Sequence, residues 1–118
     1  HNISAVEAFV ESVPKDGRGN IVLFSAVKDK DYRKMISCLC SRMDADLYIV
    51  TRIRDGRAAD AEELGRIFRE HTDKPVMVIT DLPEALGYAR QNRNGRRVWC
   101  LGSLYLTGMI KELIREDA

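Results

Sequence analysis

The sequence predicts an α/β fold in which helices cover both faces of a mostly parallel sheet. Segments with apolar residues at helical spacing alternate with short apolar runs along the whole chain. Those runs are continuous rather than interrupted by polar residues, which is typical of parallel strands that are covered on both sides. With 118 residues, the chain has the size of one domain with one hydrophobic core.

The expected helices are marked by capping side chains and by apolar stripes. Ser4 with Glu7 predicts a capping box for a first helix over residues 4–13, and Asp60 with Glu63 predicts another for the third helix. Each helix then shows apolar residues three and four positions apart. The remaining helices are expected over residues 31–43, after Thr80 or Asp81, and around Leu106, Ile110, Leu113 and Ile114.

Four apolar runs between the helices predict the strands, over residues 20–26, 47–50, 75–79 and 97–101. Parallel strands joined by right-handed crossovers place every loop that follows a strand at one edge of the sheet. Ligands of such sheets bind at that edge. The candidate loops are therefore residues 27–31, 51–59, 80–83 and 102–105.

Polar groups that suit an anion occur in these loops. Gly102 and Ser103 stand at a strand–helix junction, where free N–H groups and the helix N-terminus favour a carboxylate or phosphate, although Ser103 also suits a simple N-cap. Lys28 and Lys30 follow the first strand and could steady an anion or form a solvated helix cap. Arg57, beside a turn glycine, could hold a carboxylate with two hydrogen bonds or be a surface arginine without a ligand.

Composition excludes several function classes. Nineteen basic against eighteen acidic side chains give a net charge of +1, which argues against a nucleic-acid-binding surface. No apolar run reaches the roughly 20 residues of a membrane span, and the three cysteines fit a reduced, cytosolic protein. Two distant histidines and no Cys-x-x-Cys argue against a structural metal site. The arginines around an Asn94-Gly95 turn predict a solvated loop: Arg90, Arg93, Arg96 and Arg97.

The sequence also lacks the chemistry of a free-standing catalyst. Neither glycine-rich nucleotide loop is present, and no serine, cysteine or histidine combination forms a nucleophile with its base. The chain alone is therefore expected to be inactive.

Four short motifs, in this order, resemble those of one family. His1 and Asn2 look like the end of an Asp-Gly-Ala-His-Asn motif, so the chain is expected to begin inside that motif. Residues 24–32 are similar to a strand followed by Asp-Lys-Asp, residues 56–58 (Gly-Arg-Ala) are similar to Pro-Arg-Ala, and residues 102–106 match a Gly-Ser-Leu-Tyr turn. The chain thereby resembles the carboxy-terminal domain of folylpolyglutamate and dihydrofolate synthases, members of the Mur ligase superfamily.

This resemblance implies a Rossmann-like three-layer domain that spans residues 1–118 and forms the amino-acid-binding lobe of a larger ATP-dependent ligase. Such a ligase phosphorylates a folate or dihydropteroate carboxylate, and the amino group of L-glutamate attacks the acyl phosphate. ATP and Mg²⁺ would be bound mainly by a central domain that, like the N-terminal domain, is absent from this chain. The resemblance further implies folate and one-carbon metabolism, a cytoplasmic location, a monomer, and the protein's own central domain as partner, with no nucleic acid or membrane.

Carried over motif by motif, the resemblance implies that His1, Lys30 and Ser103 contact the glutamate carboxylates. No catalytic residue and no metal ligand is expected in this chain. Gly56 replaces the family's usual proline and Ser25 stands where glycine is common, so the chain departs from the family pattern at both positions. Other implied contacts to substrate or ATP are Asn2, Asp31, Arg57 and Tyr105.

Two other functions stay open at this point. A Mur peptidoglycan ligase has a lobe of the same type, although residues 30–32 and the Leu104-Tyr105 pair lean toward the folate branch. A small α/β binding or regulatory module that does no chemistry would show the same alternation of helices and strands.

Overall fold

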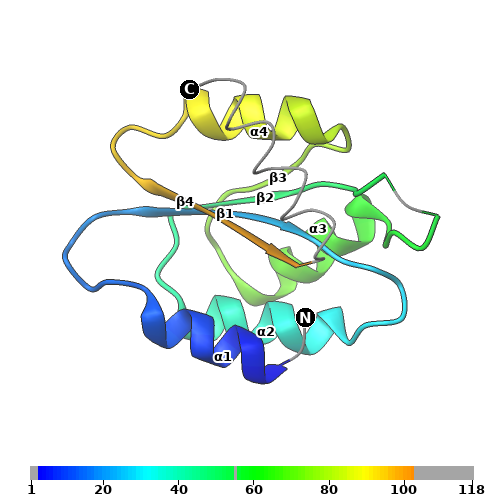
Figure 1. The fold of residues 1–118 in the computed structure, drawn as a ribbon, viewed down its shortest axis with the longest axis horizontal. Helices are drawn as coiled ribbons and strands as arrows, with labels where there is room; N and C mark the ends of the chain where they lie inside the picture. Colours follow the sequence, from blue (N-terminus) through cyan, green and yellow to red (C-terminus); the bar gives the residue numbers. More distant parts are fainter. Residues whose placement is uncertain (1–2, 55, 103–118) are drawn as a thin grey trace.

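The computed structural model describes residues 3–54 and 56–102, which form a three-layer α/β domain (Figure 1). Four strands build the sheet in the order β3–β2–β1–β4, and all neighbouring strands are parallel. The predicted α/β class and parallel sheet are therefore confirmed. The helix expected around Leu106 to Ile114 lies outside the described residues. The strands are β1 (Asn20–Ser25), β2 (Leu47–Val50), β3 (Val76–Val78) and β4 (Arg97–Gly102).

The described helices are divided unequally between the two faces of the sheet. Three helices cover one face and the fourth covers the other (Figure 1). The first face carries α1 (Ile3–Ser12), α2 (Tyr32–Arg42) and α3 (Ala61–His71), and the second carries α4 (Leu82–Gln91). Because α2 and α3 lie on the same face and start at the same edge, the loops before them are neighbours.

Each face of the sheet has its own hydrophobic core. Phe24 of β1 and Tyr48 of β2 contact Phe68 of α3, with ring centroids 5.4 Å and 4.9 Å apart. Leu23 and Ile49, which point to the opposite face, pack with α4. Successive side chains of a strand alternate between faces, so a continuous apolar strand supplies both cores. This explains why the central strands β1 and β2 show no polar alternation.

Three aspartates begin three of the helices. The carboxylates of Asp31, Asp60 and Asp81 each accept a hydrogen bond from a backbone N–H two or three residues further on, at 3.0–3.3 Å. These bonds satisfy N–H groups that have no partner within the helix. Asp60 and Asp81 are confirmed as caps, and the cap of the last of these helices is Asp81 rather than Thr80. The expected box of Asp60 with Glu63 is wrong, because Asp60 accepts from the N–H of Glu62 and the Glu63 carboxylate accepts from the Tyr32 hydroxyl.

The start of α1 differs from the prediction. Ser4 lies inside the first turn of α1 rather than before it, so the capping box of Ser4 and Glu7 is wrong. Glu7 instead accepts a hydrogen bond from the Arg42 guanidinium of α2 at 3.2 Å. The Ser-x-x-Glu pattern is local, whereas the partner of Glu7 is 35 residues away and could not be seen in it.

Candidate functional site

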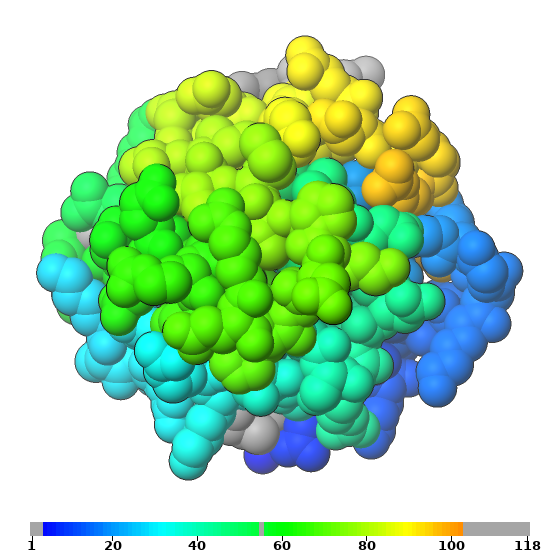
Figure 2. All heavy atoms as spheres, turned by 180° about the vertical axis from the view of Figure 1, so that it is seen from behind, coloured from blue at the N-terminus to red at the C-terminus, as the bar shows by residue number. Residues whose placement is uncertain are grey.

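The loops that follow β1 and β2 are joined to each other at the carboxyl edge of the sheet. The backbone N–H of Lys28 donates to the carbonyl oxygen of Arg57 at 2.7 Å, and the N–H of Ala59 donates to the carbonyl oxygen of Ala26 at 2.9 Å. These bonds flank a short antiparallel bridge. The two loops lie side by side at the left of Figure 2. The structure therefore unites two of the sequence motifs.

The charged side chains of the first loop have different surroundings. Lys28 and Lys30 are exposed, so their ammonium groups are accessible to an anion at this edge. The Asp31 carboxylate accepts a hydrogen bond from the backbone N–H of Lys34 at 3.3 Å and lies 3.6 Å from the Lys34 ammonium. Asp31 thus holds the start of α2, and the helix in turn fixes the end of the lysine-bearing loop.

The ends of β1 and β4 lie at the point where the sheet reverses its direction of growth. The chain leaves β1 for β2 on one side and returns to β4 on the other, and ligands of parallel sheets bind at such a point. Gly102 pairs there with Ser25. Its φ is +112°, and a Cβ at this position would overlap the carbonyl oxygen of Ser25. The geometry therefore requires glycine at the residue that precedes Ser103.

A shallow hollow of about 430 Å³ lies at the same edge. It is formed by the loops after β2 and β3, and Arg52, Arg54 and Gly56 line one part of it while Thr80 and Asp81 line the other. Arg52 and Arg54 were not predicted as contacts from the sequence. The available signal was their position directly after a buried strand, where a side chain reaches the ligand-binding edge.

Comparison with known proteins places this geometry in a family. A family model described as "Mur ligase, glutamate ligase domain" matches residues 1–104. The chain belongs to this family. A search of curated protein sequences gives no significant match.

Solved structures of folylpolyglutamate synthases share the fold of this glutamate ligase domain. FolC of E. coli in complex with DHPP and ADP is 20% identical with a TM-score of 0.81, over 99% of this chain and 27% of that chain. Folylpolyglutamate synthase of Thermotoga maritima is 23% identical with a TM-score of 0.80, over 100% and 27%. The Mycobacterium tuberculosis enzyme complexed with ADP is 20% identical with a TM-score of 0.77, over 97% and 28%.

These matches confirm the predicted resemblance and fold. The chain spans about a quarter of the length of the enzymes that it matches, between 27% and 28% of each. At this level of identity the likeness concerns the fold, so the activity of the longer proteins is not transferred to the glutamate ligase domain by the comparison alone.

The predicted site residues of the glutamate ligase domain divide into two groups. Lys30, Asp31 and Arg57 lie in the two joined loops at the carboxyl edge. Their contacts with a substrate stay predictions, as does every role of the second group, which lies outside the described residues. That group consists of His1, Asn2, Ser103 and Tyr105.

Gly56 and Ser25, the two departures from the family pattern, lie in different surroundings: Gly56 is at the surface and Ser25 is buried. Gly56 lines the edge hollow. A Cβ built on it would meet no atom of the surrounding structure within 4 Å, so there is space for a larger side chain at this position. The Ser25 hydroxyl is fully buried and has no hydrogen-bond partner among residues 3–54 and 56–102. A buried hydroxyl without a partner costs about 1–3 kcal/mol.

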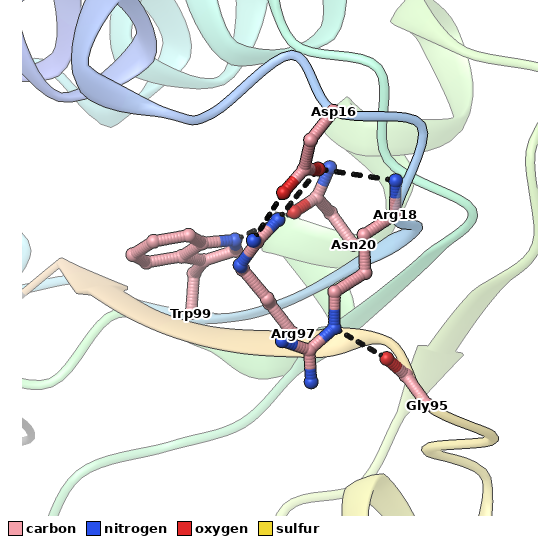
Figure 3. Close-up of polar contacts among 6 residues, drawn as sticks. All are labelled: Asp16, Arg18, Asn20, Gly95, Arg97 and Trp99. Atoms are coloured by element: carbon pink, nitrogen blue, oxygen red, sulfur yellow. Dashed lines mark hydrogen bonds and ion pairs between the residues drawn. The ribbon is translucent and has the colours of Figure 1, made fainter.

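The opposite, amino edge of the sheet is held by a polar network (Figure 3). Two guanidinium nitrogens of Arg97 contact both carboxylate oxygens of Asp16, and this pairing holds the pKa of Asp16 well below its usual range. The Arg18 guanidinium donates to the carbonyl oxygen of Gly95 at 2.6 Å. A hollow of about 870 Å³ lies beside this network. The prediction of a solvated loop thus holds for Arg93 and Arg96 only, because Arg90 lies in α4 and Arg97 lies in β4, where it is partly buried and paired with Asp16.

Within the part of the chain that the structure describes, no three His, Cys, Asp or Glu side chains come together as a metal-binding group. In the same residues, no helix has the length and apolar character that crossing a bilayer requires.

Proposed function

We propose that this chain is the amino-acid-binding lobe of an ATP-dependent ligase that adds L-glutamate to folate or dihydropteroate. The observation that carries the proposal is the meeting of two motif loops, 28–31 and 56–58, beside the β1–β4 switch point where Gly102 lies. Membership of the glutamate ligase domain family supports glutamate as the amino acid that is added. The fold shared with folylpolyglutamate synthases supports folate or dihydropteroate as the acceptor.

The chemistry of the edge suits glutamate as the incoming amino acid. Glutamate carries two carboxylates, and a cation that donates a hydrogen bond to a carboxylate binds it more strongly than a neutral donor does. Lys30 and Arg57 bring two cations to loops that are hydrogen-bonded together. In the proposal, Lys30 acts with His1 and Ser103 on the carboxylates, while Asn2, Asp31, Arg57 and Tyr105 give further contacts to substrate or ATP.

The role of this lobe is to hold and orient the amine. ATP supplies the phosphoryl group that activates the acceptor carboxylate. Positioning an amine next to an activated carboxylate can contribute about 7–11 kcal/mol to lowering the barrier. The sequence has no glycine-rich nucleotide loop and the described residues form no metal-binding group. They do not fit ATP or Mg²⁺ as a complete site, so we assign both to the rest of the protein.

The test is a lysine substitution in the full-length ligase with a matched control. Lys30→Met keeps the aliphatic stem and removes the charge, and Lys74→Met makes the same change on an exposed lysine before β3 at the opposite edge. We expect Lys30→Met to raise KM for glutamate about tenfold or more, because a hydrogen bond to a charged group contributes about 1.5–3 kcal/mol. KM for ATP should stay within about twofold.

The same enzyme also separates the alternative functions. ADP release that requires glutamate with a folate or dihydropteroate supports the proposal, whereas release only with a muramyl acceptor would assign the lobe to peptidoglycan synthesis. No release with any acceptor would favour a binding module. An unchanged KM for glutamate in Lys30→Met would remove Lys30 from the site.

A further inference from the structure

A hydrogen bond joins the start of α2 to the start of α3. The Tyr32 hydroxyl donates to Oε2 of Glu63 at 2.9 Å, and both side chains are half-buried. Tyr32 is the first residue of α2, and Glu63 lies in the first turn of α3. Burial and the Glu63 carboxylate raise the pKa of Tyr32, so its hydroxyl keeps the proton that it donates at neutral pH.

This bond closes a ring that contains both motif loops. The Lys28 N–H bonded to the Arg57 carbonyl forms one end of the ring, and Tyr32 bonded to Glu63 forms the other. Residues 28–32 form one side of the ring and residues 57–63 form the other. The side with residues 57–63 is also anchored near Arg57, where the N–H of Ala59 donates to the carbonyl oxygen of Ala26 and Ala58 and Ala59 are buried. The Tyr32–Glu63 contact ties the far end of the ring and limits how far the two sides can separate there.

The first side of the ring is shaped by two backbone hydrogen bonds. The N–H of Lys30 donates to the carbonyl oxygen of Val27 at 3.3 Å, and the N–H of Tyr32 donates to the carbonyl oxygen of Lys30 at 2.8 Å. Lys30 is therefore two residues from Tyr32 and directly bonded to its backbone. Because of this hydrogen bond, a shift of the Tyr32 backbone also moves the backbone of Lys30.

The second side is shaped by the cap of α3. The Asp60 carboxylate accepts from the N–H of Glu62 at 3.3 Å, and its carbonyl oxygen accepts from the N–H of Leu64 at 3.1 Å. These bonds make residues 60–64 one rigid turn, and Glu63 projects from it. Between this turn and Arg57, the N–H of Ala59 donates to the carbonyl oxygen of Ala26 at 2.9 Å, so backbone hydrogen bonds hold the segment from Arg57 to Glu63.

A second contact between the same helices provides a comparison. Arg33 of α2 donates to Glu70 of α3 at 3.0 Å, with both side chains about half exposed. Glu70 lies at the other end of α3 from the motif loops. If the only role of these contacts were to hold α2 against α3, loss of either one would have the same effect on substrate binding.

We propose that Tyr32 and Glu63 are positioning residues that hold the Lys28–Asp31 loop at the correct distance from the Arg57 loop for the amino acid substrate. The inference rests on the proposed function, since it concerns the same site. Neither side chain touches the substrate in this proposal, and both act through the placement of Lys30 and Arg57.

The test uses three substitutions in the full-length ligase. Tyr32→Phe removes only the hydroxyl, Glu63→Leu removes the acceptor, and Glu63→Gln keeps an acceptor oxygen. We expect Tyr32→Phe and Glu63→Leu to raise KM for glutamate by about 3- to 10-fold, because a fraction of molecules no longer holds the loops in the binding geometry. Glu63→Gln should retain most of the affinity, and KM for ATP should change by less than about twofold.

Two controls match these variants in chemistry but lie away from the motif loops. Tyr88→Phe makes the same hydroxyl deletion on α4, on the opposite face of the sheet, and Glu70→Leu breaks the second α2–α3 contact. Both should leave KM for glutamate unchanged. Thermal unfolding of each variant shows whether it is folded, and if Tyr32→Phe does not fold, the pair Glu63→Leu and Glu63→Gln carries the test.

Several outcomes would overturn the inference. An unchanged KM for glutamate in Tyr32→Phe and Glu63→Leu would do so, as would an equal rise in Glu70→Leu or an equal rise of KM for ATP. The Lys30→Met variant separates this failure from failure of the proposed function. If Lys30→Met raises KM for glutamate and Tyr32→Phe does not, the positioning role is wrong and the proposed function stands. If neither variant does, Lys30 is not in the site and the positioning role is wrong, and the proposed function is then decided by whether ADP release requires glutamate with a folate or dihydropteroate.

Discussion

Replacing three glycines by alanine, one at a time, tests the geometry at the β1–β4 switch point. The three positions differ in backbone φ and in the space available for a Cβ. Gly87 lies in α4 with no heavy atom within 4 Å of a built Cβ. Gly95 has an equally open surrounding but a φ of +81°. Gly102 has a φ of +112° and a Cβ that would overlap the Ser25 carbonyl oxygen, with the carbonyl carbon at 2.7 Å.

The free-energy changes follow from these surroundings. Gly87→Ala should stabilise the chain by about 0.5–1 kcal/mol, because alanine is the better helix former. Gly95→Ala should cost about 1–2 kcal/mol from the left-handed backbone alone. Gly102→Ala adds an overlap with backbone that cannot rotate away, so β4 must move from β1. Overpacking costs a further 1–3 kcal/mol or so, which gives a total of about 2–5 kcal/mol.

The assay is urea unfolding of the 118-residue chain, followed by circular dichroism and by tryptophan fluorescence. Trp99 is the single tryptophan of the sequence and lies in β4, so its emission reports the strand that Gly102→Ala disturbs. The midpoint should fall in the order Gly87→Ala, wild type, Gly95→Ala, Gly102→Ala. If Gly102→Ala loses no more stability than Gly95→Ala, the close approach to Ser25 is wrong.

Two further predictions concern buried polar groups. Asn20→Ala should lower the free energy of unfolding by about 1–3 kcal/mol. It removes the hydrogen bond from Trp99 Nε1 at 2.8 Å and the bond to the Asp44 carbonyl oxygen at 3.3 Å. Urea unfolding measures this loss, and an unchanged midpoint would contradict it. Burial raises the pKa of the Cys40 and Cys100 thiols to about 11. Because the thiolate is the reactive form, their alkylation rates should rise about tenfold per pH unit from pH 8 to 10, and a plateau near pH 9 in mass-spectrometric labelling would refute it.

Much of the architecture was predictable from local patterns in the sequence. The strand β2, the caps Asp60 and Asp81, and the alternation that indicates a parallel sheet are all encoded within a few neighbouring residues. The motifs at the strand ends were located in the same way, since a residue that follows a buried strand must lie at an edge of the sheet. The capping boxes expected for Ser4 with Glu7 and for Asp60 with Glu63 failed, because in each case the glutamate bonds to a residue of another helix.

Contacts between distant residues came only with the folded chain. No local pattern predicts that Tyr32 bonds to Glu63, that Lys28 bonds to Arg57, or that Trp99 bonds to an asparagine 79 residues away. Helical and strand periodicity records which face of an element is buried, but not which element buries it. The strand order, and with it the switch point between β1 and β4, depends on how whole elements pack. That packing is set by the summed fit of many side chains, which no short segment contains.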